Sequence, residues 1–223
     1  MNNLCVRGCA QTVTLRRDPA LPWRYAELLL PGGGPYRMAM AALVPRYTAA
    51  EIRRFPDDGL RYEVIRGELF VSPAPGTAHQ RAVVEFTVPL HAYLTTHRIG
   101  EVLPAPFEVE FARDSAVQPD VIMILKAQRP RLSRKRLTGP PAVAIEIVSY
   151  SSKRTDRLQK RQLYQDDGVG EYWIVDLDQR HVERWRPGDT VPEVLTERLT
   201  WRPAPRIPAF ELDLRALFAT ANA

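Results

Sequence analysis

The chain has few cysteines and histidines, and this limits the kinds of metal site that it can build. Its 223 residues include two cysteines, Cys5 and Cys9, and four histidines. The two cysteines could supply half of a zinc site, but no further cysteine or histidine completes it. His91 and His97 are six residues apart, which places them on different sides of a helix. The sequence favours two free thiols over a Cys/His metal centre.

Long hydrophobic runs are also missing. No apolar run approaches the roughly 20 residues of a membrane-spanning helix. Residues 1–10 lack the apolar stretch of a secretory signal. We therefore expect a cytoplasmic protein without a membrane partner. The Gly32-Gly33-Gly34 run lacks the Gly-Lys-Ser/Thr that follows in a phosphate-binding loop.

What is present is an ordinary globular composition with a basic excess. Hydrophobic residues make up 45% and charged residues 26% of the chain, and the formal net charge is +5. A positive excess fits a polyanion such as DNA, because lysine and arginine displace counterions from phosphates. Many proteins that never bind nucleic acid are equally basic, so charge alone does not assign the partner.

Residues 1–45 differ from the rest by their glycine run and five prolines, and show little periodicity. This composition predicts a disordered or loosely packed N-terminal extension, followed by one domain over 46–223. We expect helices over 48–55, 78–98, 151–167 and 210–218, and strands over 60–65, 68–72, 101–111, 117–125, 142–148, 171–176 and 181–185. Thr48 and Glu51 predict a capping box, and Arg66-Gly67 a hairpin turn.

Two acidic residues stand where burial disfavours a charge. Asp120 follows Pro119 at the start of an apolar run, and Glu146 interrupts the apolar run Val143–Val148. A carboxylate in a buried strand costs several kcal/mol unless it is paired or binds a cation. Two such carboxylates on neighbouring strands supply the hard oxygen ligands that Mg²⁺ or Mn²⁺ prefers. The alternatives are a salt bridge from Glu146 to an arginine and a turn capped by Asp120.

A lysine on the following helix strengthens the metal hypothesis. Asp156, Lys160 and Tyr164 recur every four residues, so they share one helix face. From the spacing alone, an ion pair on a solvated surface is an equal alternative. In the functional interpretation, Lys160 approaches the two carboxylates, orients an attacking water and stabilises the transition state.

Taken together, these residues resemble the Uma-two family of restriction endonucleases, a branch of the PD-(D/E)XK nuclease superfamily. The resemblance covers about residues 47–218. The matching pieces are Tyr62-Glu63-Val64-Ile65-Arg66-Gly67-Glu68-Leu69, His79-Gln80-Arg81, Gln118-Pro119-Asp120-Val121, Glu146-Ile147-Val148-Ser149, Asp156 through Lys160 to Tyr164, and Gly170-Glu171-Tyr172-Trp173-Ile174-Val175-Asp176. Each piece is weak alone, and their combined order is specific.

The resemblance implies a mixed α/β (α+β) fold of the restriction-endonuclease-like kind, with a central mixed sheet flanked by helices. It implies a metal-dependent endonuclease that cuts DNA, with Asp120 and Glu146 as motif acids and the carbonyl of Ile147 in the metal shell. The superfamily commonly places lysine two residues after the second acid, where this chain has Val148. The Uma-two pattern resembles a migrated lysine, and Lys160 fits that place. Related enzymes often act as homodimers.

Several further assignments stay open at this point. Glu63 is a secondary candidate for the acidic centre, or an exposed strand residue. His79 either approaches the site or caps the long helix. The cluster Arg129–Arg136 either follows a phosphate backbone or is a solvated loop. Two other functions compete with the enzyme: a non-catalytic DNA-binding or regulatory protein on a nuclease-like fold, and an interaction scaffold whose buried acids form structural ion pairs.

Overall fold

The computed structural model describes residues 13–17, 24–28, 46–148 and 155–223. Contacts divide the chain into a first unit, Met1–Pro45, and a second unit, Arg46–Ala223. In the first unit, β1 (Val13–Arg17) pairs with β2 (Arg24–Leu28) in an antiparallel hairpin, which we did not predict. Strands of five residues are too short to outweigh the prolines and glycines around them in a sequence window. The other residues of the predicted extension lie outside the described ones.

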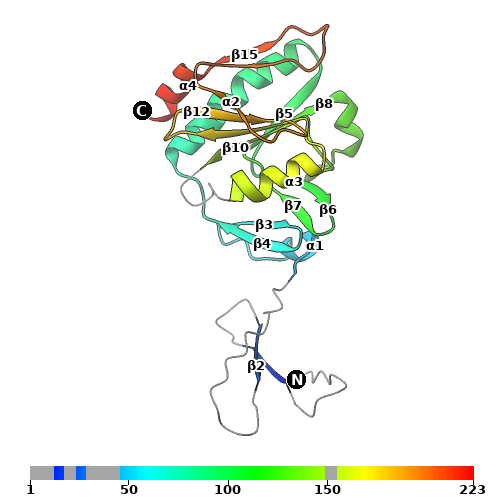
Figure 1. Cartoon of the computed structure of the whole chain (residues 1–223). Coiled ribbons are helices and arrows are strands. Elements are labelled where there is room, and N and C mark those ends of the chain that lie inside the picture. The colour runs from blue at the N-terminus through cyan, green and yellow to red at the C-terminus, as the bar shows by residue number, and fades with distance from the viewer. Residues whose placement is uncertain (1–12, 18–23, 29–45, 149–154) are drawn as a thin grey trace. The chain divides into compact units, whose positions relative to one another are not determined.

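The second unit is built around a six-stranded mixed sheet (Figure 1). In spatial order its strands are β13 (Glu193–Leu195), β12 (His181–Trp185), β11 (Glu171–Asp176), β10 (Val143–Val148), β8 (Val121–Leu125) and β5 (Gly100–Pro104). β10 and β11 run parallel, and every other neighbouring pair is antiparallel. This is the central mixed sheet that the family resemblance implies.

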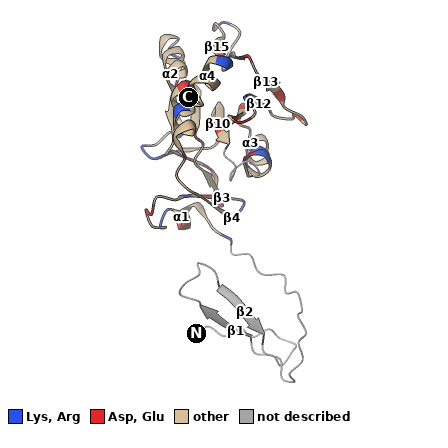
Figure 2. Ribbon diagram, turned by 90° about the vertical axis from the view of Figure 1, so that its left-hand side faces the viewer, with Lys and Arg blue, Asp and Glu red and all other residues tan. Residues whose placement is uncertain are grey.

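Helices cover both faces of this sheet. The helical segments are α1 (Ala49–Ile52), α2 (Thr77–Thr96), the 3₁₀ helix η1 (Lys126–Arg131), the π-helix η2 (Thr155–Lys160), α3 (Arg161–Asp166) and α4 (Leu214–Ala221). Figure 2 shows α2 and α4 on one side of β10 and α3 on the other. None of the described helices is both long and apolar enough to cross a membrane.

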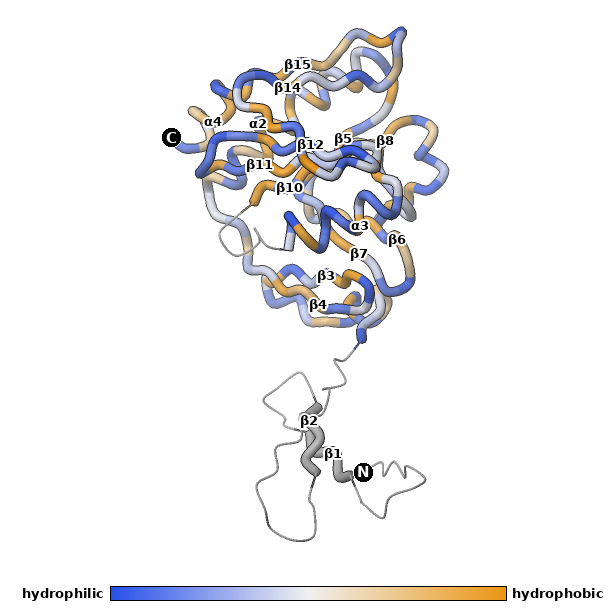
Figure 3. The backbone as a smooth tube through the Cα atoms, viewed as in Figure 1, coloured by the Kyte–Doolittle hydropathy of each residue, from blue (hydrophilic) through white to orange (hydrophobic). Residues whose placement is uncertain are grey.

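The central strand β10 is buried along its whole length, and its tube is strongly hydrophobic in Figure 3. Its side chains alternate between two cores, as the period of a strand requires. Val143, Ile145 and Ile147 pack with α2 and α4, whereas Ala144 and Val148 pack with α3 and a second sheet. The same alternation turns Glu146, between Ala144 and Val148, toward α3 and the second sheet.

The second sheet has five strands in the order β4-β3-β7-β6-β9. They are β4 (Glu68–Ser72), β3 (Arg61–Ile65), β7 (Ser115–Val117), β6 (Glu108–Ala112) and β9 (Arg136–Thr138). The predicted hairpin joins β3 to β4 through Arg66 and Gly67, whose φ angles of 51° and 82° form the left-handed turn that favours glycine. The predicted capping box of Thr48 and Glu51 begins α1, which ends at Ile52 rather than Phe55.

Two predicted strands are each divided between the two sheets, which corrects the sequence analysis. The predicted strand 101–111 is β5 in the six-stranded sheet and β6 in the five-stranded sheet. The predicted strand 117–125 is β7 in the five-stranded sheet and β8 in the six-stranded sheet. Prolines mark both breaks, at Pro104 and Pro106 and at Pro119. Proline cannot donate a hydrogen bond to a ladder, so pairing stops there and the chain crosses to the other sheet.

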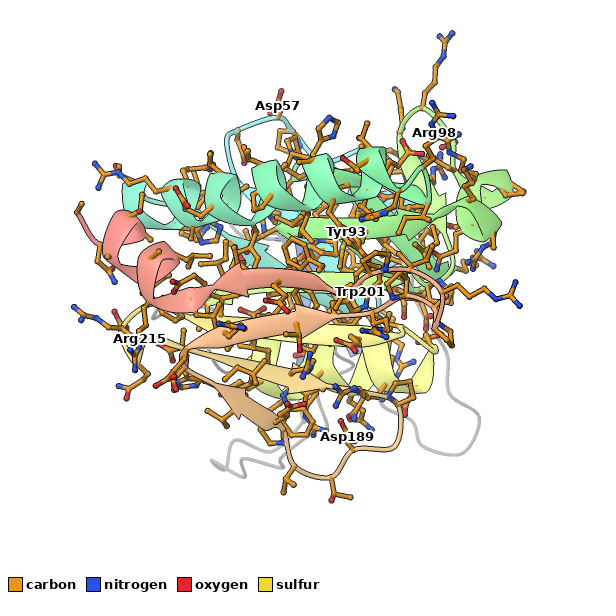
Figure 4. All side chains as sticks on the ribbon, turned by 90° about the horizontal axis from the view of Figure 1, so that it is seen from above. Asp57, Tyr93, Arg98, Asp189, Trp201 and Arg215 are labelled. Carbon is orange, nitrogen blue, oxygen red and sulfur yellow. The ribbon has the colours of Figure 1, made fainter. Side chains whose placement is uncertain are left out.

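The C-terminal segment is also corrected. The predicted helix 210–218 begins as β15 (Phe210–Asp213), which pairs with β14 (Arg198–Trp201), and α4 follows after its N-cap, Asp213. Tyr93 of α2 packs against both aromatic residues of this hairpin. Its ring centroid is 6.2 Å from that of Trp201 (Figure 4) and 5.4 Å from that of Phe210. This contact with α2 stabilises an extended segment that the local pattern does not distinguish from a helix.

Gly100 allows the close approach of β5 and β8. A Cβ atom at this position would lie 2.2 Å from the carbonyl oxygen of Ile124. We expect Gly100→Ala to lower the free energy of unfolding by about 1–3 kcal/mol, because the backbone of β8 must shift. Urea denaturation followed by circular dichroism measures the loss. Gly76→Ser is the control: a Cβ there meets nothing within 4 Å, and because serine is a preferred N-cap for α2, an unchanged or slightly higher midpoint is expected. Equal midpoints for both variants would contradict the close approach.

Candidate active site

A pocket of about 230 Å³ opens between the two sheets' strands and the start of α2. One wall is the end of β4 with the β4–α2 connection, residues 73–76. Its polar lining includes Arg61, Glu63, His79, Asp120, Glu146, Asp156 and Lys160. These residues are up to 99 positions apart in the sequence (Arg61 to Lys160), so only the fold brings them together. The three predicted catalytic residues and three of the four secondary candidates line this one pocket.

Glu146 is fixed at the centre of the six-stranded sheet. Its side chain leaves β10 on the face that α3 covers, and the residue is 2% exposed. Its Oε1 atom accepts hydrogen bonds from Nζ of Lys160 at 2.9 Å and from the hydroxyl of Tyr164 at 3.0 Å. The alternative of a salt bridge from Glu146 to an arginine is therefore wrong, because its cationic partner is Lys160.

Asp120 lies beside Glu146 because of the strand register. Val121 of β8 pairs with Ile145 of β10 in antiparallel fashion, so the residue before Val121 falls next to the residue after Ile145. Oδ2 of Asp120 accepts a hydrogen bond from the backbone N–H of Ile147 at 2.9 Å. Oδ1 accepts one from Nη1 of Arg61 at 2.9 Å. Asp120 therefore joins β8, β10 and β3.

Lys160 is buried among three carboxylates. Its Nζ atom is 2.9 Å from Oε1 of Glu146, 2.9 Å from Oε2 of Glu63 and 3.6 Å from Oδ1 of Asp156. The solvated surface pair that the spacing also allowed is wrong, because Asp156 and Lys160 are both buried. Lys160 ends the π-helix η2 rather than lying inside an α-helix, and π-turns occur frequently at functional sites. The predicted start of this helix, Ser151 or Ser152, lies outside the described residues.

Glu63 belongs to the same acidic cluster. The residue is 2% exposed, so the interpretation as an exposed strand residue is wrong. Besides the ion pair with Lys160, its Oε1 atom accepts a hydrogen bond from the backbone N–H of Gln118 at 2.6 Å. Gln118 belongs to the Gln118–Asp120 segment between β7 and β8. Glu63 thus holds in place the segment that carries Asp120.

His79 faces the pocket from the first turn of α2. The helix begins after Gly76, with no side-chain cap, so His79 does not cap it. Its Nε2 atom is 3.2 Å from Oδ1 of Asp120, without the alignment of a hydrogen bond. Tyr164 meets the cluster from α3, where its ring packs 4.6 Å from that of Tyr172. All four secondary candidates therefore surround the two motif acids or Lys160.

The two motif acids have opposite pKa shifts. Burial raises the pKa of Glu146 well above its usual value; Lys160 opposes this, and the charges of Asp120, Asp156 and Glu63 add to it. Burial also disfavours ionised Asp120, but His79, Arg61 and the Ile147 N–H outweigh it and lower the pKa of Asp120 to about 2. The surrounding carboxylates raise the pKa of Lys160 despite its burial, so its amine stays protonated. Perturbed carboxylates of this kind are common in active sites.

The donors around the pocket suit a hard divalent cation. Among the described lining residues, four carboxylates face the two fixed cations Arg61 and Lys160. With all four carboxylates ionised, the lining would carry an excess of two negative charges. A divalent cation would balance that excess, and its preferred ligands are carboxylate and carbonyl oxygens. No three His, Cys, Asp or Glu side chains within the described ranges form a ready ligand group. Arg61 and the Ile147 N–H engage Asp120, and Lys160 and Tyr164 engage Glu146.

Comparison with known proteins decides the family. The model of the Uma2 family, described as "Putative restriction endonuclease", matches residues 49–215. The chain belongs to the Uma2 family. The family resemblance found from the sequence motifs is thereby confirmed.

The fold of this Uma2 protein resembles a solved structure. The crystal structure of a "putative nuclease belonging to DUF820" from Anabaena variabilis superposes with a TM-score of 0.65 at 21% sequence identity. The match covers 78% of this chain and 99% of that one. The restriction-endonuclease-like fold class is thus supported by a known structure. No curated protein matches the chain.

One residue of the Uma2 site was missed by the sequence analysis. Arg61 begins β3 two positions before Glu63, so the two side chains project from the same face of the strand. The alternation with Glu63 was the signal that could have found it. An arginine at the start of a strand usually points to solvent, so this alternation becomes informative only once Glu63 is assigned to the acidic centre.

The basic cluster Arg129–Arg136 of this Uma2 protein is partly engaged by the protein itself. Arg129 pairs with Glu101, Arg131 donates to the carbonyl of Pro140, and Arg136 pairs with Glu110. The segment forms η1 and the start of β9 rather than a plain loop. Contact with a phosphate backbone stays a prediction.

Proposed function

We propose that this Uma2 protein is a metal-dependent endonuclease that hydrolyses phosphodiester bonds in DNA. The observation that carries the proposal is the convergence of Asp120, Glu146 and Lys160 on one pocket. Each of these residues is almost completely buried, although burial of a charge disfavours folding. The family description as a restriction endonuclease supports the same reaction.

Asp120, Glu146 and the carbonyl of Ile147 would hold Mg²⁺ or Mn²⁺. A bound divalent cation supplies Lewis acidity toward a phosphoryl oxygen and acidifies water. Glu146 is disfavoured as an anion in this pocket, and a cation at its carboxylate would remove that cost. Asp120 is ionised throughout the physiological pH range, as a carboxylate ligand must be.

The residues around the two acids would position them and stabilise charge. Hydrolysis adds the oxygen of water to phosphorus, breaks a P–O bond of the backbone and returns a proton to the leaving oxygen. Negative charge grows on the phosphoryl oxygens during this step, and the ammonium of Lys160 would stabilise it. Glu63 and Asp156 hold Lys160, Tyr164 holds Glu146, and His79 lies against Asp120.

Cleavage of DNA tests the proposal directly. Purified full-length protein should convert supercoiled plasmid to nicked and linear forms, and linear DNA to shorter products, with Mg²⁺ or Mn²⁺ and not with EDTA. We expect Asp120→Asn and Glu146→Gln to lower the rate by at least about 100-fold, because each removes a ligand charge at the reacting centre. Gel electrophoresis of the products over time gives the rates.

A matched control separates catalysis from folding. Glu197→Gln changes a surface glutamate paired with Arg215 and should cut DNA like the wild type. Circular dichroism should show all variants folded. If the wild type binds DNA equally well with Mg²⁺ and with EDTA and never cuts it, the protein is a DNA-binding or regulatory protein instead.

A further inference from the structure

Arg61 is hydrogen-bonded to Asp120, the carboxylate that would bind the proposed metal. The residue begins β3, and its side chain is 20% exposed at the edge of the pocket. Its Nη1 atom binds Oδ1 of Asp120 at 2.9 Å and the carbonyl of Gln118 at 3.2 Å. Arg61 therefore reaches Asp120 across the gap between the two sheets, from the side of the pocket.

Both carboxylate oxygens of Asp120 lie close to nitrogen atoms of other residues. Oδ2 is engaged by the N–H of Ile147, which belongs to the rigid strand β10. Oδ1 has Arg61 at 2.9 Å and Nε2 of His79 at 3.2 Å. The backbone N–H cannot leave without breaking the register of β10, whereas the arginine side chain is long and partly exposed. Arg61 is thus the contact that a ligand of Asp120 displaces most easily.

The charge of Arg61 has the same consequence. The positive charges of Arg61 and Lys160 partly balance the carboxylates that line the pocket. Lys160 is fully enclosed by Glu63, Glu146 and Asp156, but Arg61 lies at the rim beside Asp120. A divalent cation bound at Asp120 and the guanidinium of Arg61 would compete for the same carboxylate. Two positive charges so close together repel each other in a poorly solvated site.

We propose that Arg61 is a resident counter-cation of Asp120, which the divalent metal displaces, so that Arg61 sets the metal affinity of the site. The inference rests on the proposed function, because it requires Asp120 to be a metal ligand. It assigns Arg61 a positioning role: the guanidinium keeps Asp120 ionised and oriented in the absence of metal, and limits binding to conditions in which the cation can outcompete it.

Metal titration without DNA tests this role. Mn²⁺ binding to the full-length protein is followed by the electron paramagnetic resonance signal of free Mn²⁺ and by calorimetry. We expect Arg61→Gln to bind Mn²⁺ about tenfold more tightly than the wild type, since the glutamine is uncharged and releases a charge-assisted hydrogen bond. Arg66→Gln is the matched control: it removes the same charge from the same hairpin, but its partner is the exposed Asp166. Its affinity should equal that of the wild type.

A second variant and a second measurement keep the test decisive. Arg61→Lys keeps the charge with a shorter reach, so its affinity should lie between those of the wild type and Arg61→Gln. Saturating Mn²⁺ should also raise the melting temperature of Arg61→Gln more than that of the wild type. Unchanged or weaker binding by Arg61→Gln overturns the proposal, because Arg61 would then support the ligand geometry instead of competing for it.

Failure of the proposed function has a different signature. If the wild type does not bind Mn²⁺, or if Asp120→Asn binds it as tightly as the wild type, the metal centre itself is wrong. If wild-type binding depends on Asp120 but Arg61→Gln does not tighten it, only the role of Arg61 is wrong.

Discussion

Lys160→Met should lower the free energy of unfolding by about 3–5 kcal/mol, because it leaves buried carboxylates without their shared cation. The ammonium of Lys160 contacts Glu146, Glu63 and Asp156, and its side chain is 4% exposed. Methionine fills a similar volume, so the loss reports the charge and not a cavity. For a chain of this size the melting temperature should fall by about 6–20 °C.

Differential scanning calorimetry in EDTA measures the loss. Arg215→Met is the matched control: it removes the cation of an exposed pair with Glu197, and a change below about 1 kcal/mol is expected. The double variant Lys160→Met/Glu146→Gln should recover part of the loss, because it removes one of the uncompensated carboxylates. Equal losses in the single and double variants would show that Lys160 stabilises the fold by packing and not by charge.

The buried acids illustrate what the sequence predicts well. Glu146 interrupts an apolar run, and Asp120 precedes one, so their burial follows from local pattern alone. The antiparallel pairing of Val121 with Ile145 then places the two acids side by side. The spacing of Lys160 on the next helix predicts its face, although not its depth. The two acids were found because each interrupts or precedes an apolar run, and Lys160 was found by its helical spacing.

The residues that the sequence predicts poorly depend on contacts between distant segments. Glu63 and Arg61 alternate with apolar residues on β3, as the residues of a half-exposed strand do. They are enclosed because the five-stranded sheet packs against the α3 face of β10, and no local pattern reports that packing. The prolines at 104, 106 and 119 mark breaks in strands, but they do not show that the chain moves to the other sheet at each break.

The roles of Arg61 and Glu63 nevertheless follow from their enclosure between the two sheets. A strand face that carries an arginine and a glutamate can enter a core only if both find partners, and here the partners are Asp120 and Lys160. The acidic cluster is therefore a property of two sheets together. The sequence motifs predict the central residues of the cluster, and the packing of the two sheets determines which residues surround them.

Glu146→Gln should make the metal-free protein more stable, in contrast to its loss of cleavage. The folded-state pKa of Glu146 is raised above its unfolded value by burial and by neighbouring carboxylates. Such a group stabilises the fold fully only below the unfolded pKa of about 4.3, and this stability is lost as the pH rises through the folded pKa. The advantage of the glutamine variant should therefore be near zero at pH 4 and increase with pH to a plateau.

Melting temperatures of the wild type and the variant between pH 4 and 9, in EDTA, measure this difference. Glu197→Gln is the control, since its carboxylate is 67% exposed and its substitution should shift the melting temperature little at any pH. Saturating Mg²⁺ should reverse the order, because the cation stabilises only a protein that retains its ligand. A Glu146→Gln variant that is less stable than the wild type in EDTA at pH 8 would mean that the pair with Lys160 outweighs the repulsion. Glu146 would then be a structural ion-pair partner, and a buried acid kept at a cost to stability would no longer argue for a metal.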